Sequence, residues 1–257
     1  MYRRPRIIPC LLIQERDMVK TNKFSNPRYL GDPVNAVKIF NRKGVDELSI
    51  LDITATKVNK EPNFELLQEI ATEAFMPLSY GGGIKSLEQI QYLFSIGYEK
   101  VIINSALVRK PELIREAVEY AGAQSIVASI DAKKDIFGKY HAYINSGLEK
   151  TSYSPVDLAK YAESLGVGEI LLNSINNDGE MKGYDLKLVR DVCNVVSIPV
   201  IACGGASNIN DLKEVIEEGH AHAAAAGSMF VYYGKQKAVL ITAPSEKELA
   251  DIGIYSE

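Results

Sequence analysis

Eight short apolar runs, rich in β-branched residues, recur along the chain and are separated by longer amphipathic stretches. The short runs have the length and composition of buried strands. The longer stretches carry apolar residues at helical spacing and often begin with Asp, Ser or Pro, as helices do. The predicted strands are residues 6–13, 47–52, 77–80, 100–104, 125–131, 169–173, 199–202 and 221–226. Predicted helices between them include residues 33–43, 86–95, 111–121, 154–165 and 209–218.

This alternation predicts a parallel sheet whose strands are joined by helices, and eight such units close into a (β/α)8 TIM barrel. A barrel of this kind needs about 250 residues, and the chain has 257. The composition is 46% hydrophobic and 24% charged, as in a globular protein with a large core. We therefore expect one α/β domain, a single (β/α)8 barrel that spans residues 1–257.

The second half of the chain repeats motifs of the first half. Gly82 precedes Ser105 by the same interval that separates Gly205 from Ser228. Such self-similarity indicates two similar half-barrels. The alternative is chance similarity among strand–helix units, because glycines after strands are common. Two further pairs of segments align, residues 7–12 with residues 126–131 and residues 43–48 with residues 165–170.

Each half places glycines after an odd-numbered strand and a small polar residue after the next strand. In a barrel these positions lie at the C-terminal face, where barrel enzymes hold their sites. Glycine lets a ligand approach the backbone, and amides at a helix N-terminus attract phosphate. Two copies on opposite sides of the mouth predict an elongated ligand phosphorylated at both ends. The alternative is that the glycines only form tight turns.

Charge and residue usage exclude several classes of function. The net charge of −4 gives no basic field for nucleic acid. No run reaches the roughly 18 apolar residues of a membrane span, and the N-terminus leads into a strand instead of a signal-peptide core. We therefore expect a cytoplasmic protein with no membrane partner. The three cysteines and three histidines lack metal-site spacing, so we expect neither a metal nor another cofactor.

Ten short motifs carry a resemblance to a known family. They are RIIPC at 6–10, GDP at 31–33, DEL at 46–48, LDITA at 51–55, GGGI at 81–84, IDAK at 130–133, GEILL at 168–172, NDG at 177–179, GYD at 183–185 and GGA at 204–206. In order and spacing, from about residue 5 to residue 230, the chain resembles the cyclase subunit of imidazole glycerol phosphate synthase.

The resemblance implies a barrel that takes ammonia from a glutaminase subunit and a substrate with two phosphates. That substrate is the phosphoribulosyl formimino aminoimidazole carboxamide ribonucleotide, which the family converts to imidazole glycerol phosphate in histidine biosynthesis. The phosphate contacts implied at one end are Gly82, Asn104 and Ser105. Those implied at the other end are Asp178, Gly179, Gly205, Gly227 and Ser228.

Ring closure with ammonia needs proton transfers on both sides of a carbon atom, which suits two carboxylates facing each other across the substrate. Asp131 ends the fifth predicted strand and matches one catalytic aspartate of the family. The other ends the first strand, where this chain has Leu12, and the internal repeat also pairs Leu12 with Asp131. A leucine cannot exchange a proton. Lys20 is retained in the first loop as a candidate to act with Asp131, and Asp17 is a further residue that could reach in.

Four charged residues stand at the starts of predicted strands, two cations and two anions at one level. This pattern predicts a closed ring of salt bridges at the N-terminal mouth of the barrel. In the family that the chain resembles, these positions form the gate through which ammonia enters. The alternative is a purely stabilising role, which charged residues at this face commonly have. The four residues are Arg6, Glu47, Lys100 and Glu169.

The resemblance further implies a heterodimer, with the glutaminase docked at the N-terminal face, where Glu99 and Gln124 match docking positions. Three interpretations stay open. The chain looks closest to a subgroup with CLL at residues 10–12 and MFV at residues 229–231, for which sugar amidination in lipopolysaccharide or O-antigen synthesis is proposed. The second interpretation is a working cyclase in which Asp131 acts without a second aspartate. The third is an isomerase of a related barrel family, which would also need two carboxylates.

Overall fold

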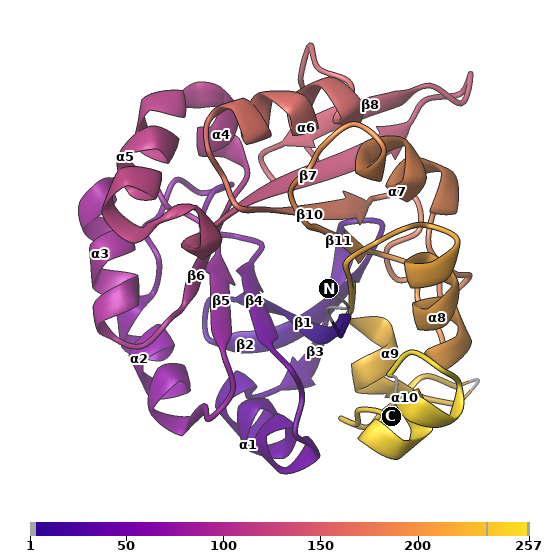
Figure 1. The fold of residues 1–257 in the computed structure, drawn as a ribbon. Coiled ribbons are helices and arrows are strands. Elements are labelled where there is room, and N and C mark those ends of the chain that lie inside the picture. Colours follow the sequence, from indigo (N-terminus) through magenta and orange to yellow (C-terminus); the bar gives the residue numbers. More distant parts are fainter. Residues whose placement is uncertain (1–3, 235, 256–257) are drawn as a thin grey trace.

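The computed structural model describes residues 4–234 and 236–255. Eight parallel strands pair in a closed circle that helices surround (Figure 1). The predicted (β/α)8 barrel is therefore confirmed, and each predicted strand overlaps an observed one. In circular order the strands are β1 (Arg6–Gln14), β4 (Leu48–Asp52), β5 (Leu78–Gly81), β6 (Lys100–Ile103), β7 (Ile126–Lys134), β10 (Glu169–Ser174), β11 (Val200–Cys203) and β12 (Ala223–Ala226), which pairs with β1 again.

Helices cover the outside of the barrel, and side-chain caps fix where several of them begin. Asp32, Ser86 and Ser154, for example, each accept a backbone N–H from the first turn that follows. No described helix has the length and apolar character needed to cross a membrane. The helices are α1 (Pro33–Lys43), α2 (Phe64–Glu73), α3 (Leu87–Ser95), α4 (Ser105–Arg109), α5 (Pro111–Ala121), η1 (Ala123–Ser125), α6 (Pro155–Ser164), α7 (Leu186–Cys193), α8 (Ile209–Glu217), α9 (Ser228–Val231) and α10 (Glu246–Asp251).

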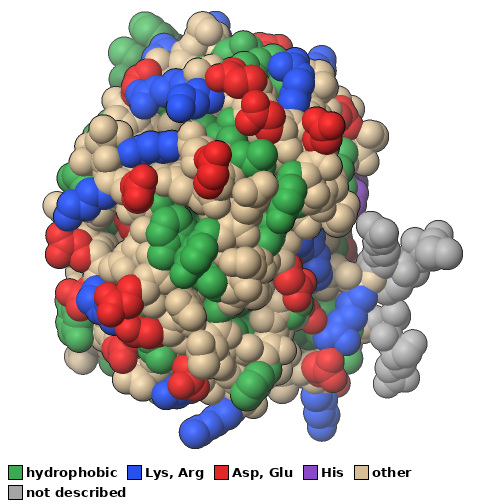
Figure 2. Space-filling view, turned by 90° about the vertical axis from the view of Figure 1, so that its left-hand side faces the viewer, with side chains coloured by type: hydrophobic (Ala, Val, Ile, Leu, Met, Phe, Trp, Pro, Cys, Tyr) green, Lys and Arg blue, Asp and Glu red, His purple; other side chains and the backbone are tan. Residues whose placement is uncertain are grey.

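Two hydrophobic cores hold these layers together. The larger core lies between the helices and the barrel wall, and the smaller one fills the barrel interior. Because side chains alternate between the two faces of a strand, every second residue of each strand points inward. The outer surface over α2, α3 and α5 mixes charges of both signs with scattered apolar side chains (Figure 2). The inner core contains Ile8, Cys10, Ile102, Val127, Leu171, Ile201, Cys203, Ala223 and Ala225.

Two β-hairpins extend the barrel strands of equivalent position in the two halves. The chain leaves β1 into β2 (Asp17–Asn22) and β3 (Ser25–Gly31), and it leaves β7 into β8 (Tyr140–Ile144) and β9 (Glu149–Lys150). The second hairpin projects beyond the barrel in Figure 1. A small antiparallel pair, β13 (Tyr232–Tyr233) with β14 (Ala238–Val239), follows the last barrel strand. Neither of the two hairpins was predicted from the sequence.

Candidate active site

A cavity of about 400 Å³ opens at the C-terminal ends of the barrel strands. Every residue predicted for catalysis or phosphate contact lines it. These residues come from segments that are far apart in the sequence, from β2 near the N-terminus to α9 near the C-terminus. Leu12 lines it as well. The structure therefore brings these predicted residues into one site, while their roles remain proposals. The predicted residues that line the cavity are Lys20, Gly82, Asn104, Ser105, Asp131, Asp178, Gly179, Gly205, Gly227 and Ser228.

Asp131 lies at the C-terminal part of β7 and is 7% exposed. Burial raises the pKa of this carboxyl to about 7, and the charge of Asp178 adds to the effect. Leu12 lines the cavity from β1, which stands opposite β7 in the circle of strands. Asp17 is exposed, pairs with Gln14 at the far end of the hairpin and is not among the residues that line the cavity. The expectation that Asp17 could reach in is wrong.

Lys20 comes from β2 and is held by a buried ion pair. Its Nζ lies 2.7 Å from Oδ1 of Asp178 and also donates to the carbonyl of Thr21 at 2.9 Å. The hydroxyl of Thr21 donates to Oδ2 of Asp178 at 3.0 Å. These bonds tie the first hairpin to the loop after β10 and fix a cation at the cavity wall.

The predicted phosphate site of the first half surrounds Gly82 and Ser105. Gly82 has a φ of +133°, and a Cβ there would lie 2.6 Å from the carbonyl oxygen of Asp52, so only glycine fits. Ser105 begins α4, and its hydroxyl accepts the backbone N–H of Asn145 at 3.0 Å. Asn104 donates its side-chain amide to the carbonyl of Ser129 at 3.0 Å. Four cations also line this side of the cavity, namely Lys57, Lys85, Arg109 and Lys110.

The predicted phosphate site of the second half surrounds Gly205 and Ser228. Gly205 has a φ of +119°, and a Cβ there would lie 2.1 Å from the carbonyl oxygen of Gly183. Ser228 begins the short helix α9, and its buried hydroxyl oxygen has no hydrogen-bond partner among the residues that the structure describes. A buried polar atom without a partner at a cavity indicates a place for a ligand.

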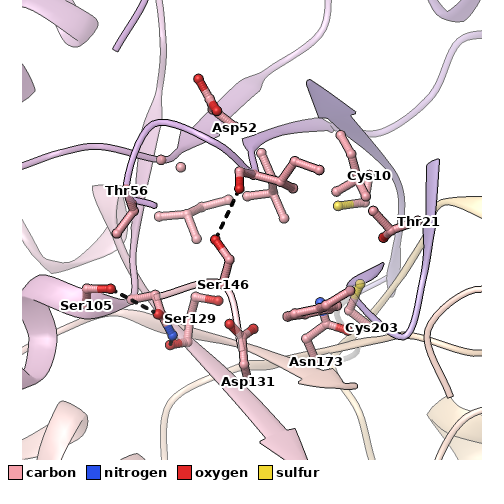
Figure 3. A pocket seen from close by; sticks show the side chains of 18 of the residues that line it. Cys10, Thr21, Asp52, Thr56, Ser105, Ser129, Asp131, Ser146, Asn173 and Cys203 are labelled. Atoms are coloured by element: carbon pink, nitrogen blue, oxygen red, sulfur yellow. Dashed lines mark hydrogen bonds between the residues drawn. The ribbon is translucent and has the colours of Figure 1, made fainter. Parts of the chain in front are cut away.

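Several inward-facing residues of the cavity were not identified from the sequence. Ser129 stands two residues before Asp131 on β7, so strand alternation alone would have placed it inward. Cys10 and Cys203 both line the cavity, and Figure 3 shows their sulfur atoms on the same side of it. A hydrogen bond to Cys10 and burial raise the pKa of the Cys203 thiol well above its ordinary value. Asn173, at the end of β10, is the fourth such residue.

The turn between β8 and β9 covers part of the mouth of the cavity. The hydroxyl of Ser146 donates to the carbonyl of Ile53 at 3.3 Å, a bond that Figure 3 shows above Asp131. Gly147 lies against the ring of Phe24 in the first hairpin, because a Cβ there would be 2.9 Å from that ring. The two hairpins and the loop after β4 therefore meet over the site.

The four charged residues at the strand starts form the predicted ring. Glu47 accepts from Arg6 at 2.5 Å and from Lys100 at 2.8 Å. Glu169 accepts from Lys100 at 2.9 Å and also bonds Arg6, which closes the circle. Both glutamates are buried. On the same N-terminal side, Glu99 immediately precedes β6 and Gln124 lies in η1 before β7, and both are exposed, as a docking role would require.

Comparisons with known proteins agree along the whole barrel. A family model described as "Histidine biosynthesis protein" matches residues 6–237. The "Putative imidazole glycerol phosphate synthase subunit hisF2" of Pseudomonas aeruginosa is 50% identical over 250 residues, which cover 97% of this chain and 99% of that protein. The "Putative imidazole glycerol phosphate synthase subunit HisF" of Leptospira interrogans is 48% identical over 246 residues, 95% of this chain and 97% of the relative.

A third relative, the "Imidazole glycerol phosphate synthase subunit HisF" of Petrotoga mobilis, is 44% identical over 228 residues, which cover 88% of this chain and 90% of that protein. The family match spans all eight barrel strands, and the relatives align along nearly their full length. The chain therefore belongs to the HisF family, the cyclase subunits of imidazole glycerol phosphate synthase.

Proposed function

We propose that this barrel receives ammonia from a glutaminase subunit at its N-terminal face and delivers it to the cavity at the C-terminal face. The ring of Arg6, Glu47, Lys100 and Glu169 is the observation that supports this route most. Its two cations and two anions pair with one another, so their charges cancel around a narrow polar mouth. The apolar interior above the ring favours neutral ammonia over ammonium, because burying an unpaired charge is costly.

The ammonia serves a reaction other than the ring closure of histidine biosynthesis. We assign it to the conversion of a sugar amide to an amidine during lipopolysaccharide or O-antigen synthesis. Leu12 supports this assignment, because it removes one of the two proton-transferring groups that the cyclisation needs. The Pseudomonas relative bears the numbered name hisF2, which fits a role apart from histidine biosynthesis.

A working cyclase is the second candidate. The raised pKa of Asp131, about 7, favours it, because a general acid or base works best when its pKa lies near the operating pH. The two sets of glycines in one cavity also suit a ligand with two phosphates. In this candidate, Lys20 or water would replace the missing aspartate.

Cyclisation by the purified barrel separates the two candidates. The assay supplies the phosphoribulosyl formimino aminoimidazole carboxamide ribonucleotide with an ammonium salt, and calorimetry measures its binding. We expect the substrate to bind without efficient turnover. Turnover at ordinary cyclase rates would overturn the assignment to amidination and leave the cyclase.

The ammonia route has its own test at the ring. In the complex with its glutaminase, Lys100→Ala should lower the glutamine-dependent reaction more than the same reaction supplied with ammonium salt. Lys182→Ala, at an exposed lysine paired with Glu180, is the matched control. The docked face should bury about 1,200–2,000 Å² and include Glu99 and Gln124. If Lys100→Ala lowers the glutamine-dependent and the ammonium-dependent rates equally, ammonia does not pass through the ring.

A further inference from the structure

The two ends of the described chain meet at one carboxylate, that of Asp46, just before β4. The hydroxyl of Tyr255, which follows α10, donates to Oδ2 of Asp46 at 2.5 Å. Arg4, which precedes β1, donates to Oδ1 at 3.3 Å, and its guanidinium lies 3.7 Å from the centre of the Tyr255 ring. Tyr255 is 6% exposed, so the C-terminal segment is packed against the start of the chain.

Asp46 also holds the first barrel strand. Its Oδ2 accepts the backbone N–H of Ile7 at 2.9 Å. Because β4 pairs with β1 only from Cys10 onwards, the side chain of Asp46 takes the place of a neighbouring strand at Ile7. Ile7 directly follows Arg6, and Asp46 directly precedes Glu47. One carboxylate therefore sets the position of β1 relative to the segment that carries the adjacent member of the ring.

Within the ring, Glu47 depends most on where its backbone is placed. Its Oε2 accepts from both Arg6 and Lys100, while its buried Oε1 has no partner in the described part of the chain. Glu169, in contrast, uses both of its oxygens. A glutamate held through one oxygen can pivot about that oxygen, so a shift between β1 and the segment before β4 would loosen this side of the ring first.

We propose that Asp46 and Tyr255 are positioning residues for the ring, through which the C-terminal segment keeps Arg6 and Glu47 in register. This inference rests on the proposed function for the use of the ring and deepens it, because it names what regulates the entrance. Releasing Tyr255 would free the Asp46 carboxylate and with it the start of β1. The helix α10, on the outside of the barrel between α1 and α8 (Figure 1), is thereby coupled to the ammonia entrance.

The first test uses the full chain without glutaminase and measures hydrogen exchange at the Ile7 amide and the NMR signals of the Arg6 side chain. In Tyr255→Phe, exchange at Ile7 should accelerate by up to about tenfold, because Asp46 loses a hydrogen bond that a charged group accepts. The Arg6 signals should shift. Tyr140→Phe is the matched control, since Tyr140 also donates to a carboxylate, that of Asp185 at 2.7 Å, and has a lysine over its ring. It should leave both readouts unchanged.

The second test uses the complex with the glutaminase and compares glutamine with ammonium salt as the nitrogen source. Tyr255→Phe should lower the glutamine-dependent rate by up to about tenfold and leave the ammonium-dependent rate unchanged. A merely structural defect would lower both rates. Asp46→Asn keeps one carbonyl oxygen as an acceptor, so its glutamine-dependent rate should fall less than that of Asp46→Ala.

Unchanged Ile7 exchange and Arg6 signals in Tyr255→Phe would overturn the positioning role, as would changes that Tyr140→Phe reproduces. Equal losses with both nitrogen sources would do the same. Should Asp46→Ala fail to fold, Tyr255→Phe and Asp46→Asn still decide. The measurements at the ring need no glutaminase, so they stand even if an indifferent Lys100→Ala removes the ammonia route, and their failure would leave that route untouched.

Discussion

Lys20 and Asp178 form a buried ion pair, with Nζ and Oδ1 2.7 Å apart, although 158 residues separate them in the chain. Lys20 belongs to the hairpin of the first half-barrel, and Asp178 belongs to the loop after β10 in the second half. The wall of the cavity at this point is therefore held by a contact between the two halves. Thr21 strengthens it by donating to the other carboxylate oxygen.

Lys20→Met should destabilise the fold, because it leaves the charge of Asp178 buried without its partner. Removing one member of a buried pair costs about 3–5 kcal/mol. Urea denaturation measures this change in the free energy of unfolding. Lys182→Met is the control, since its side chain is 76% exposed and its ion pair with Glu180 should contribute at most about 1 kcal/mol. Equal losses in the two variants would mean that water replaces the buried contact.

The pKa of Asp131, raised to about 7, should make stability depend on pH. In the unfolded chain the carboxyl has a pKa of about 3.9. Between these values the folded protein keeps a proton that the unfolded chain has lost, so stability falls as the pH rises from about 4 to about 7 and then levels off. The loss is at most ~4 kcal/mol. Asp131→Asn should remove it, which denaturation at about pH 5 and about pH 8 would reveal. If the free energy of unfolding depends on pH in the same way in both proteins, the pKa of Asp131 is not raised.

Leu12→Asp should place a second carboxylate opposite Asp131. If the cavity holds the bisphosphate substrate, ammonium-dependent cyclisation should rise by a factor on the order of 10²–10⁴. Initial rates measure the gain, and Leu12→Asp combined with Asp131→Asn should abolish it. Unchanged rates in a variant that still binds the substrate would show that residue 12 alone does not limit cyclisation.

Sulfate soaked into crystals should occupy two places, beside Gly82 with Ser105 and beside Gly205 with Ser228. The two serines serve as controls for each other. Ser228→Ala should weaken anion density only at its own site, because its hydroxyl has no partner within residues 4–234 and 236–255. Ser105→Ala should act only at the first site. If sulfate binds elsewhere and leaves both places empty, the glycines do not bind phosphate and serve only to form turns.

The barrel could be predicted because its strands are buried on both faces and therefore read as apolar runs. The hairpins could not. In β3, five consecutive residues are exposed and include Pro27, so neither an apolar run nor an alternation marks the strand. The turn before it places Lys23 and Phe24 at positive φ without a glycine that would signal it. The same hairpin explains the error at Asp17, which it holds on the exposed side opposite Gln14.

Within the site, the glycines and the charged ring could be predicted because each carries its own local or repeated signal. The partners of Lys20 and Asn173 could not, because both depend on contacts that only the closed barrel makes. Asp131 and Asn173 are neighbours through the pairing of β7 with β10, a relationship that spans a whole strand–helix unit. Strand alternation identifies inward residues, and the register decides which of them meet.

The turn of the second hairpin rests over the cavity on hydrogen bonds from Ser146 to Ile53 at 3.3 Å and from the Asn145 N–H to Ser105 at 3.0 Å, and on the contact of Gly147 with Phe24. One such bond contributes about 1 kcal/mol, whereas unfolding a domain takes about 5–15 kcal/mol. Local opening at this turn should therefore occur vastly more often than global unfolding. Loop motions of this kind take nanoseconds to microseconds, so a substrate can exchange through the mouth while the eight strands beneath it stay fully paired.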